Sequence, residues 1–187
     1  MITKGLDFDN VSVVGIMNAD NLLNFPDFRA YERAYQMFTQ VAGRAGRKQK
    51  RGVVIIQTFT PYHPVIRDVM DNNFLNFYRN EILDRRNYHY PPFYRLVKLI
   101  FRHRDSATVA KAARELASCL KKTLKVEIAG PEKPFISWIR NKHLQEIIIK
   151  IKPDKYLPVQ KRYIHKEAAQ LKSRYKGLEI IADVDPY

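Results

Sequence analysis

The chain has 187 residues and a formal net charge of +14, and 45% of its residues are hydrophobic, which is enough to form one or two small cores. Its apolar runs are the length of a strand and fall far short of the roughly 20 residues that span a bilayer. The first residues lack the basic and then apolar pattern of a secretion signal. The single cysteine, Cys119, excludes an internal disulfide and a multi-cysteine zinc site.

The first third of the chain alternates strands with a helix. Val11–Met17 and Val53–Thr58 are apolar runs suited to buried strands, and Ala30–Val41 between them contains good helix formers without Gly or Pro. A strand, a helix and a second strand in this order predict part of a parallel α/β lobe. We assign residues 1–60 to this part.

Residues 61–90 connect this lobe to the rest of the chain. Within Pro64–Arg86 the apolar residues recur every three or four positions, which predicts two short helices. The aromatic side chains share this spacing, so we interpret them as core residues rather than as a surface that stacks on bases. The dipeptide Pro91-Pro92 ends the helical pattern and marks the start of a last domain, residues 91–187.

The last domain follows the order βαββαβ, which predicts a ferredoxin-like α+β sandwich with two helices on one face of a sheet. It holds 21 Lys and Arg residues against 10 Asp and Glu, so it carries most of the positive charge and favours an anionic partner such as nucleic acid. The predicted strands are Tyr94–Arg102, Lys125–Ile139 with a break near Gly130-Pro131, Leu144–Lys152 and Leu178–Val184, and the predicted helices are Ser106–Thr123 and Leu157–Ser173.

The string Gln40-Val41-Ala42-Gly43-Arg44-Ala45-Gly46-Arg47 carries the most specific chemistry in the chain. Its two arginines are expected at a helix end, where the neighbouring glycines let the backbone approach a ligand closely. A guanidinium group donates several hydrogen bonds to phosphate oxygens and stays charged. A helix end with favourable cations and a glycine cap would explain the same string without any ligand.

This string resembles motif VI of the superfamily 2 helicases, Q-x-x-G-R-x-G-R, and Met1–Phe8 resembles their motif V. Pro26–Arg33, between the two motifs, is similar to the D-F-R-x-x-E-R segment of one group, the bacterial primosomal helicases of the PriA family. The resemblance spans most of the chain in the family's order, and it continues through Arg85-Arg86, Tyr90–Phe93 and Asp183–Pro186.

The resemblance implies the C-terminal part of lobe 2 of a RecA-like motor that hydrolyses ATP with Mg²⁺. Arg44 and Arg47 would be catalytic, because they would sense the γ-phosphate and offset negative charge in the transition state. The other residues that the two motifs imply are Gln40, Gly43 and Asp7 at the nucleotide and Thr3, Lys4 and Gly5 at the DNA backbone.

The motor implied in this way is incomplete. The chain has no phosphate loop of the form G-x-x-x-x-G-K-[ST] and no acidic metal-binding motif, so we expect the fragment alone to be inactive in ATP hydrolysis. Met1 falls where the family has an internal methionine, which indicates an excised piece or a misplaced start. The family carries a cysteine-rich zinc module upstream of motif V, so zinc is expected there, and no metal ligand is assigned within this chain.

Two groups of residues in the last domain are candidates for binding. Trp138, Arg140 and Lys142 place an aromatic ring among cations at a predicted hairpin turn, a combination that stacks on unpaired bases, and a lone Trp is equally an ordinary core residue. Lys155 and Gln160 lie where the resemblance puts the pocket for the acidic C-terminal tail of single-stranded DNA-binding protein.

For the whole protein the resemblance implies a monomeric, cytoplasmic bacterial helicase without a membrane anchor. It would move 3′ to 5′ on forked and single-stranded DNA and act with other primosome proteins to restart stalled replication forks. Two alternatives need no motor. A stand-alone nucleic-acid-binding module would leave the arginine pair unexplained, and an adaptor for acidic peptides would have little affinity for DNA.

Overall fold

The computed structural model describes residues 12–45 and 52–186 of the chain, which forms two compact units, Met1–Asp84 and Arg85–Tyr187. The division falls inside helix α4 (Phe74–Asn87), whereas the sequence predicts that the last domain starts at Pro91. Helix α4 runs past this division without a break, and its Phe77 is buried in the core of the first unit.

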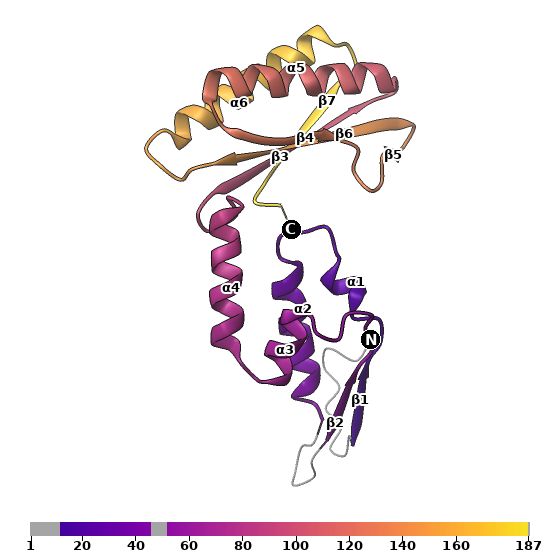
Figure 1. Cartoon of the computed structure of the whole chain (residues 1–187). Helices are drawn as coiled ribbons and strands as arrows, with labels where there is room; N and C mark the ends of the chain where they lie inside the picture. Colours follow the sequence, from indigo (N-terminus) through magenta and orange to yellow (C-terminus); the bar gives the residue numbers. More distant parts are fainter. Residues whose placement is uncertain (1–11, 46–51, 187) are drawn as a thin grey trace. The chain divides into compact units, whose positions relative to one another are not determined.

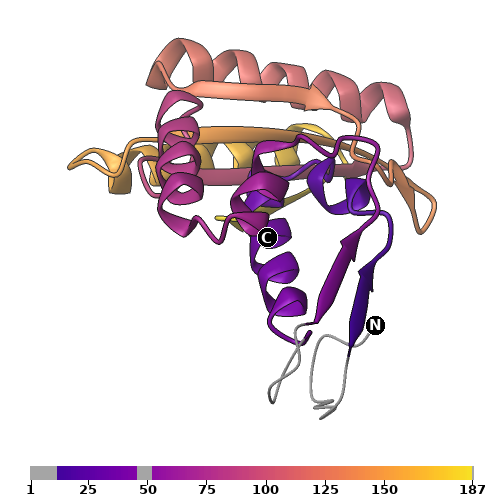
Figure 2. The same cartoon turned by 60° about the horizontal axis from the view of Figure 1, so that its bottom comes forward.

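The first unit pairs two parallel strands and packs helices on one of their faces (Figure 1). Figures 1 and 2 show α2 running beside both strands, which it connects. The strands are two or three residues shorter than predicted, and the one-turn helix α1 was not predicted. The elements, in chain order, are β1 (Val13–Ile16), α1 (Asp20–Leu23), α2 (Ala30–Ala42), β2 (Val53–Ile56) and α3 (Pro64–Met70), followed by α4.

Asp20 holds the chain that follows β2. Its carboxylate accepts hydrogen bonds from the backbone N–H of Phe59 at 3.0 Å and from the hydroxyl groups of Thr58 and Thr60 at 3.0 and 3.2 Å. Gln57 still pairs with β1, because its N–H donates to the carbonyl oxygen of Ile16 at 2.9 Å, and only the residues after Gln57 bond to the side chain that opens α1. A carboxylate in this place satisfies backbone and side-chain donors that the sheet has released.

The core of the first unit forms between α2, α3 and α4. Residues Ala34, Tyr35 and Phe38 lie on the buried face of α2, at the three- to four-residue spacing that a half-buried helix requires. Tyr35 stacks on Phe77 of α4 with 4.2 Å between ring centroids. The interpretation of the aromatic residues as core holds for Phe77 but is wrong for Phe74 and Tyr78, which are 55% and 51% exposed.

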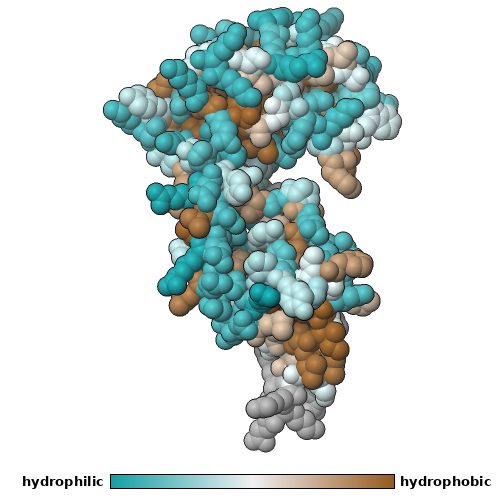
Figure 3. Space-filling model, in the orientation of Figure 1, coloured by the Kyte–Doolittle hydropathy of each residue, from teal (hydrophilic) through white to brown (hydrophobic). Residues whose placement is uncertain are grey.

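The other face of β1 and β2 is apolar and exposed. Val13, Met17, Val53 and Ile55 are all more than half exposed, and Figure 3 shows the hydrophobic patch on this part of the surface. Parallel sheets are normally covered on both faces, which is why their strands are apolar throughout. This face of the strands therefore has the composition of a surface that another element covers.

The elements of the second unit are, in chain order, β3 (Arg95–His103), α5 (Ser106–Leu124), β4 (Glu127–Glu132), β5 (Trp138–Ile139), β6 (Lys142–Ile151), α6 (Leu157–Arg174) and β7 (Glu179–Val184). They form an antiparallel sheet in the order β4-β6-β3-β7, and β5 pairs with β6 beside this path. Both helices cover one face of the sheet (Figure 1). The first strand of the unit, β3, thus lies between β6 and the last strand.

Alternation along the strands and helical spacing along α5 together build the core of the second unit. Val97, Leu99 and Phe101 point from β3 to the helices, as do alternate residues of β6. Helix α5 begins at Ser106 as predicted, and its cap residue is Asp105, whose carboxylate accepts from the backbone N–H of Thr108 at 2.8 Å. The hydrogen bonds from the side chain and backbone of Thr108 also hold the pKa of Asp105 below its usual value.

The break predicted near Gly130-Pro131 is confirmed, but the predicted strand Lys125–Ile139 is wrong between Glu132 and Trp138. β4 ends at Glu132, its register with β6 shifts between Ala129 and Glu132, and pairing resumes only at Trp138. Pro131 lies within β4 at the register shift, and Pro134, which lacks the backbone N–H that a ladder needs, follows the end of the strand. The result is a short loop followed by the two-residue strand β5.

Lys150 is a charged residue in a buried position on β6, only 9% exposed. Its ammonium group donates to the carbonyl oxygen of Tyr88 at 2.7 Å, pairs with Glu127 at 2.8 Å and lies 4.5 Å from the centroid of the Tyr90 ring. The other carboxylate oxygen of Glu127 is 2.6 Å from Nδ1 of His89. The hydrogen bonds from His89 and Lys150 hold the pKa of Glu127 below its usual value.

We expect Glu127 to make the stability of the second unit depend on pH. Because its pKa is lower in the folded state, its contribution is complete above the usual value of 4.5 and is lost as the pH falls through the folded value. In urea unfolding followed by Trp138 fluorescence, the stability advantage of the wild type over Glu127→Gln should shrink below pH 4.5. Glu132→Gln is the matched control, because Glu132 is exposed on the same strand; a constant advantage over Glu127→Gln would contradict the prediction.

Candidate nucleotide and nucleic-acid interfaces

The arginine string begins in the last turn of α2. Gln40 and Gly43 are exposed there, Arg44 is half-buried, and its backbone N–H donates to the carbonyl oxygen of Val41 at 3.0 Å. Because α2 connects two parallel strands, its C-terminal end lies near the N-terminal ends of the strands. At that edge the N–H of Val53 donates to the carbonyl oxygen of Ser12 at 2.9 Å.

Gly43 is not required by the fold. Its φ of −68° is open to any residue, so it is not the left-handed glycine cap that would explain the string without a ligand. A Cβ atom added there would lie 3.5 Å from the carbonyl oxygen of Thr39, which is ordinary van der Waals contact. An exposed glycine of this kind would let a ligand approach the backbone closely.

Five of the residues assigned from the motifs cannot be placed. Arg47 of motif VI and Thr3, Lys4, Gly5 and Asp7 of motif V lie outside the described residues.

The predicted hairpin is present, and two of its three assigned residues face solvent. Arg140 and Asn141 form the two-residue turn between β5 and β6, with φ values of 50° and 58°. Trp138 is 57% exposed, which excludes its interpretation as a core residue. The ammonium group of Lys142 pairs with the carboxylate of Glu179, so its charge is already partly balanced.

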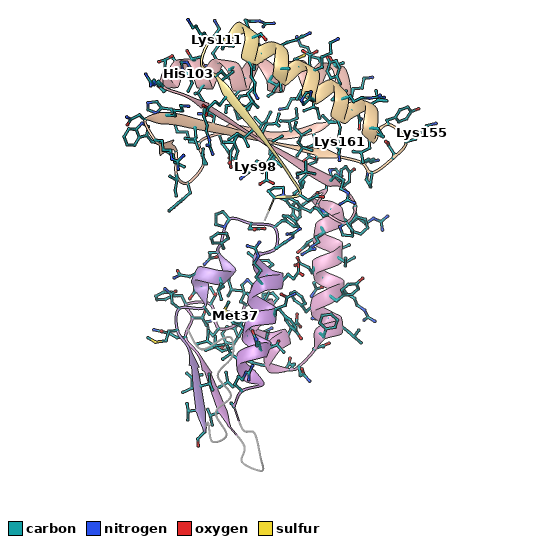
Figure 4. All side chains as sticks on the ribbon, turned by 180° about the vertical axis from the view of Figure 1, so that it is seen from behind. Met37, Lys98, His103, Lys111, Lys155 and Lys161 are labelled. Atoms are coloured by element: carbon teal, nitrogen blue, oxygen red, sulfur yellow. The ribbon has the colours of Figure 1, made fainter. Side chains whose placement is uncertain are left out.

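Lys155 and Gln160, the two residues predicted to bind a partner near the start of α6, lie in different surroundings. Lys155 is exposed, and its Nζ lies 5.2 Å from the centroid of the Tyr156 ring. Oε1 of Gln160 is buried and has no hydrogen-bond partner within residues 12–45 and 52–186. Figure 4 places Lys155 and Lys161 at the same end of this helix.

A groove of about 220 Å³ lies between α6 and the edge strand β7. Its lining is largely apolar and includes the small residues Ala168, Ala169 and Ala182. Lys161, His165 and Lys172 line it from the helix. Among the described residues β7 pairs with β3 alone, so its outer edge has unpaired backbone groups.

Sequence reasoning missed the most exposed residue of the hairpin region, Phe135, which is 100% exposed. The available signal was an aromatic residue directly after Pro134, in a segment without helical or strand periodicity. Within the part of the chain that the structure describes, no three His, Cys, Asp or Glu side chains cluster to hold a metal ion. No helix there has the length and apolar content needed to cross a bilayer.

Comparison with known proteins shows to which family the chain belongs. A family model described as the primosomal protein N C-terminal domain matches residues 86–187. The chain belongs to the PriA family. It is 37% identical over its whole length to 23% of the replication restart protein PriA of Bacillus subtilis. It is 40% identical over 80% of its length to 18% of the PriA protein of Synechocystis. It is 36% identical over its whole length to 25% of the PriA protein of Chlamydia pneumoniae. The chain thus spans a quarter or less of these PriA relatives.

Proposed function

We propose that the chain is the C-terminal portion of an ATP-dependent DNA helicase that moves 3′ to 5′ and restarts stalled replication forks. The observation that carries the proposal is the end of α2, where Gln40, an exposed Gly43 that the fold does not need, and Arg44 meet. The relatives named replication restart protein support the same role.

In this proposal the first unit is part of a RecA-like lobe 2. Its parallel strands joined through a helix support the assignment, and so does the apolar face of β1 and β2, which the rest of the lobe would cover. The second unit is a ferredoxin-like sandwich. Its support is the strand order β4-β6-β3-β7 with both helices on one face.

ATP would bind against the arginine end of α2. Arg44 and Arg47 would donate hydrogen bonds to the γ-phosphate and offset the charge that develops on its oxygens, and Gln40 would help to orient the nucleotide. The donors at this end suit phosphate and do not suit a metal ion. The accompanying Mg²⁺, the phosphate loop and the zinc module are therefore assigned to the part of the relatives that this chain does not span.

DNA contact is proposed for motif V and for the basic second unit, including Trp138 and Arg140 of the hairpin. The whole protein is proposed to act as a monomer in the bacterial cytoplasm with other primosome proteins.

The acidic tail of single-stranded DNA-binding protein is proposed to bind at the start of α6. The buried Oε1 of Gln160, which has no partner in the described part of the chain, and the cations Lys155 and Lys161 support this site. We expect Lys155→Glu to weaken binding of a fluorescent acidic-tail peptide about tenfold. Lys111→Glu on α5 changes the net charge of the chain by the same amount and should leave the peptide affinity unchanged. Equal losses of affinity in both variants would show that net charge alone causes the effect.

The proposal is tested by steady-state ATP hydrolysis with and without forked DNA. We expect turnover from the protein extended to the length of its relatives and none from the 187-residue chain. An extended protein that binds DNA without hydrolysing ATP would favour the stand-alone nucleic-acid-binding module. One that binds only acidic peptides would favour the adaptor.

A further inference from the structure

Four large apolar side chains lie exposed within five residues of the second unit. Phe135 is 100% exposed, Ile136 61%, Trp138 57% and Ile139 38%, and we call these four residues the apolar tip. They occupy the loop that follows Pro134 and the short strand β5, which pairs with β6. Contiguous exposed apolar residues of this size usually mark a binding site.

The backbone that carries the tip is held in place. The two-residue turn Arg140-Asn141 closes the hairpin, Trp138 lies opposite His143 in register, and the N–H of Leu144 donates to the carbonyl oxygen of Ser137 at 2.8 Å. A ligand that binds the tip therefore has little backbone to order, which favours affinity.

Unbalanced positive charge borders the tip on both sides. Lys133 precedes it and Arg140 follows it, and neither side chain has an ion-pair or hydrogen-bond partner in residues 12–45 and 52–186. Several cations on the sheet itself are paired, as Lys98 is with Glu146 at 3.0 Å. The nearest acid along the chain is the exposed Glu132.

We propose that the apolar tip stacks on unpaired bases of DNA while Lys133 and Arg140 hold the adjoining phosphates. Bases offer flat apolar faces only where they are unpaired, and aromatic residues among cations are the side chains that bind them. The tip then recognises single strands and the open junction of a fork rather than the interior of a duplex. This rests on the proposed DNA-binding function and names the chemical group that one part of the second unit recognises.

Trp138 makes the proposal testable in the 187-residue chain, because it is the only Trp. Its fluorescence would be titrated with a dT20 oligonucleotide, a fork and a blunt duplex with the same number of phosphates, at several salt concentrations. We expect quenching by dT20 and the fork at lower concentrations than by the duplex. Phe135→Ala should weaken dT20 binding about 5- to 150-fold, the range that loss of one base stack gives, and Phe135→Tyr should restore it.

The matched control is Phe59→Ala, which removes a 93% exposed Phe from the first unit and should leave dT20 affinity unchanged. Anisotropy could show salt-dependent binding of labelled dT20 while Trp138 fluorescence does not change and Phe135→Ala binds as tightly as the wild type. DNA would then bind elsewhere, and this result would contradict the tip proposal but not DNA binding by the chain. If the chain binds no DNA at any salt concentration, the tip proposal falls together with the proposed DNA contact of the second unit. Either result leaves the ATPase assignment to its own test.

Discussion

Replacing Arg44 or Arg47 by alanine in the complete protein is expected to lower DNA-stimulated ATP hydrolysis by about 10³- to 10⁵-fold. The loss should appear in kcat, because the guanidinium groups would act mainly on charge that develops in the transition state. Affinity for a fluorescent ATP analogue should change much less. Arg→Lys at either position should recover little activity, since an ammonium group cannot reproduce the planar set of donors.

Two variants on the same helix control for damage to the fold. Arg33→Ala removes an arginine that pairs with Asp27 at 2.9 Å, and turnover should stay within a few-fold of the wild type. Gly43→Ala should unfold at the same urea concentration as the wild type, because the added methyl group has room, and yet lower turnover by crowding the nucleotide. If Arg47→Ala hydrolysed ATP at a rate within a few-fold of the wild type, the catalytic role assigned to the arginine residues would be contradicted.

Gly130→Ala is expected to destabilise the second unit by about 2–5 kcal/mol, the largest stability effect that we predict for one methyl group. Gly130 has a φ of +89°, which side-chain-bearing residues adopt at a cost. The added Cβ would also lie 2.7 Å from the carbonyl oxygen of Glu146, a backbone atom of the central strand β6 that cannot move aside freely. The midpoint of urea unfolding followed by Trp138 fluorescence measures the loss.

Gly177→Ala separates the two causes. Gly177 has a similar φ of +84°, but its added Cβ would lie 3.5 Å from the side chain of His103, in ordinary contact. It should therefore lose only the conformational part, about 1–2 kcal/mol. Equal losses in the two variants would show that contact with Glu146 adds nothing.

The regular elements were predictable because their apolar spacing is unambiguous. Helix α5 buries Val109, Leu116 and Leu120 at intervals that only a helix satisfies, and its cap Asp105 is visible in the sequence. Strand β6 carries an unbroken apolar run that suits a central strand. For such segments local preference and tertiary packing agree.

The errors arose where contacts between segments far apart in the sequence decide the structure. Asp20 binds residues almost 40 positions later, which no local pattern reveals. The break near Gly130-Pro131 was predictable, but the length of the gap between β4 and β5 depends on pairing with β6, a distant segment.

The motifs predict which residues are candidates for binding, but not how exposed they are or which partners they have. Gln40 and Gly43 are exposed, and their role at a nucleotide stays a prediction. The burial of Oε1 of Gln160, the ion pair of Lys142 and the full exposure of Phe135 depend on the fold, so the sequence alone could not reveal them.

The position of β3 has a consequence for how the protein is made. It is the first strand of the second unit to leave the ribosome, and its two neighbours in the sheet, β6 and β7, are the last. Until β7 has been synthesised, one edge of β3 stays open and the floor of the core lacks Ile180. Pairing between distant segments is slow, so the nascent domain passes through a state with an exposed apolar edge. Nascent chains that stall before Glu179 should therefore be the ones that chaperones retain.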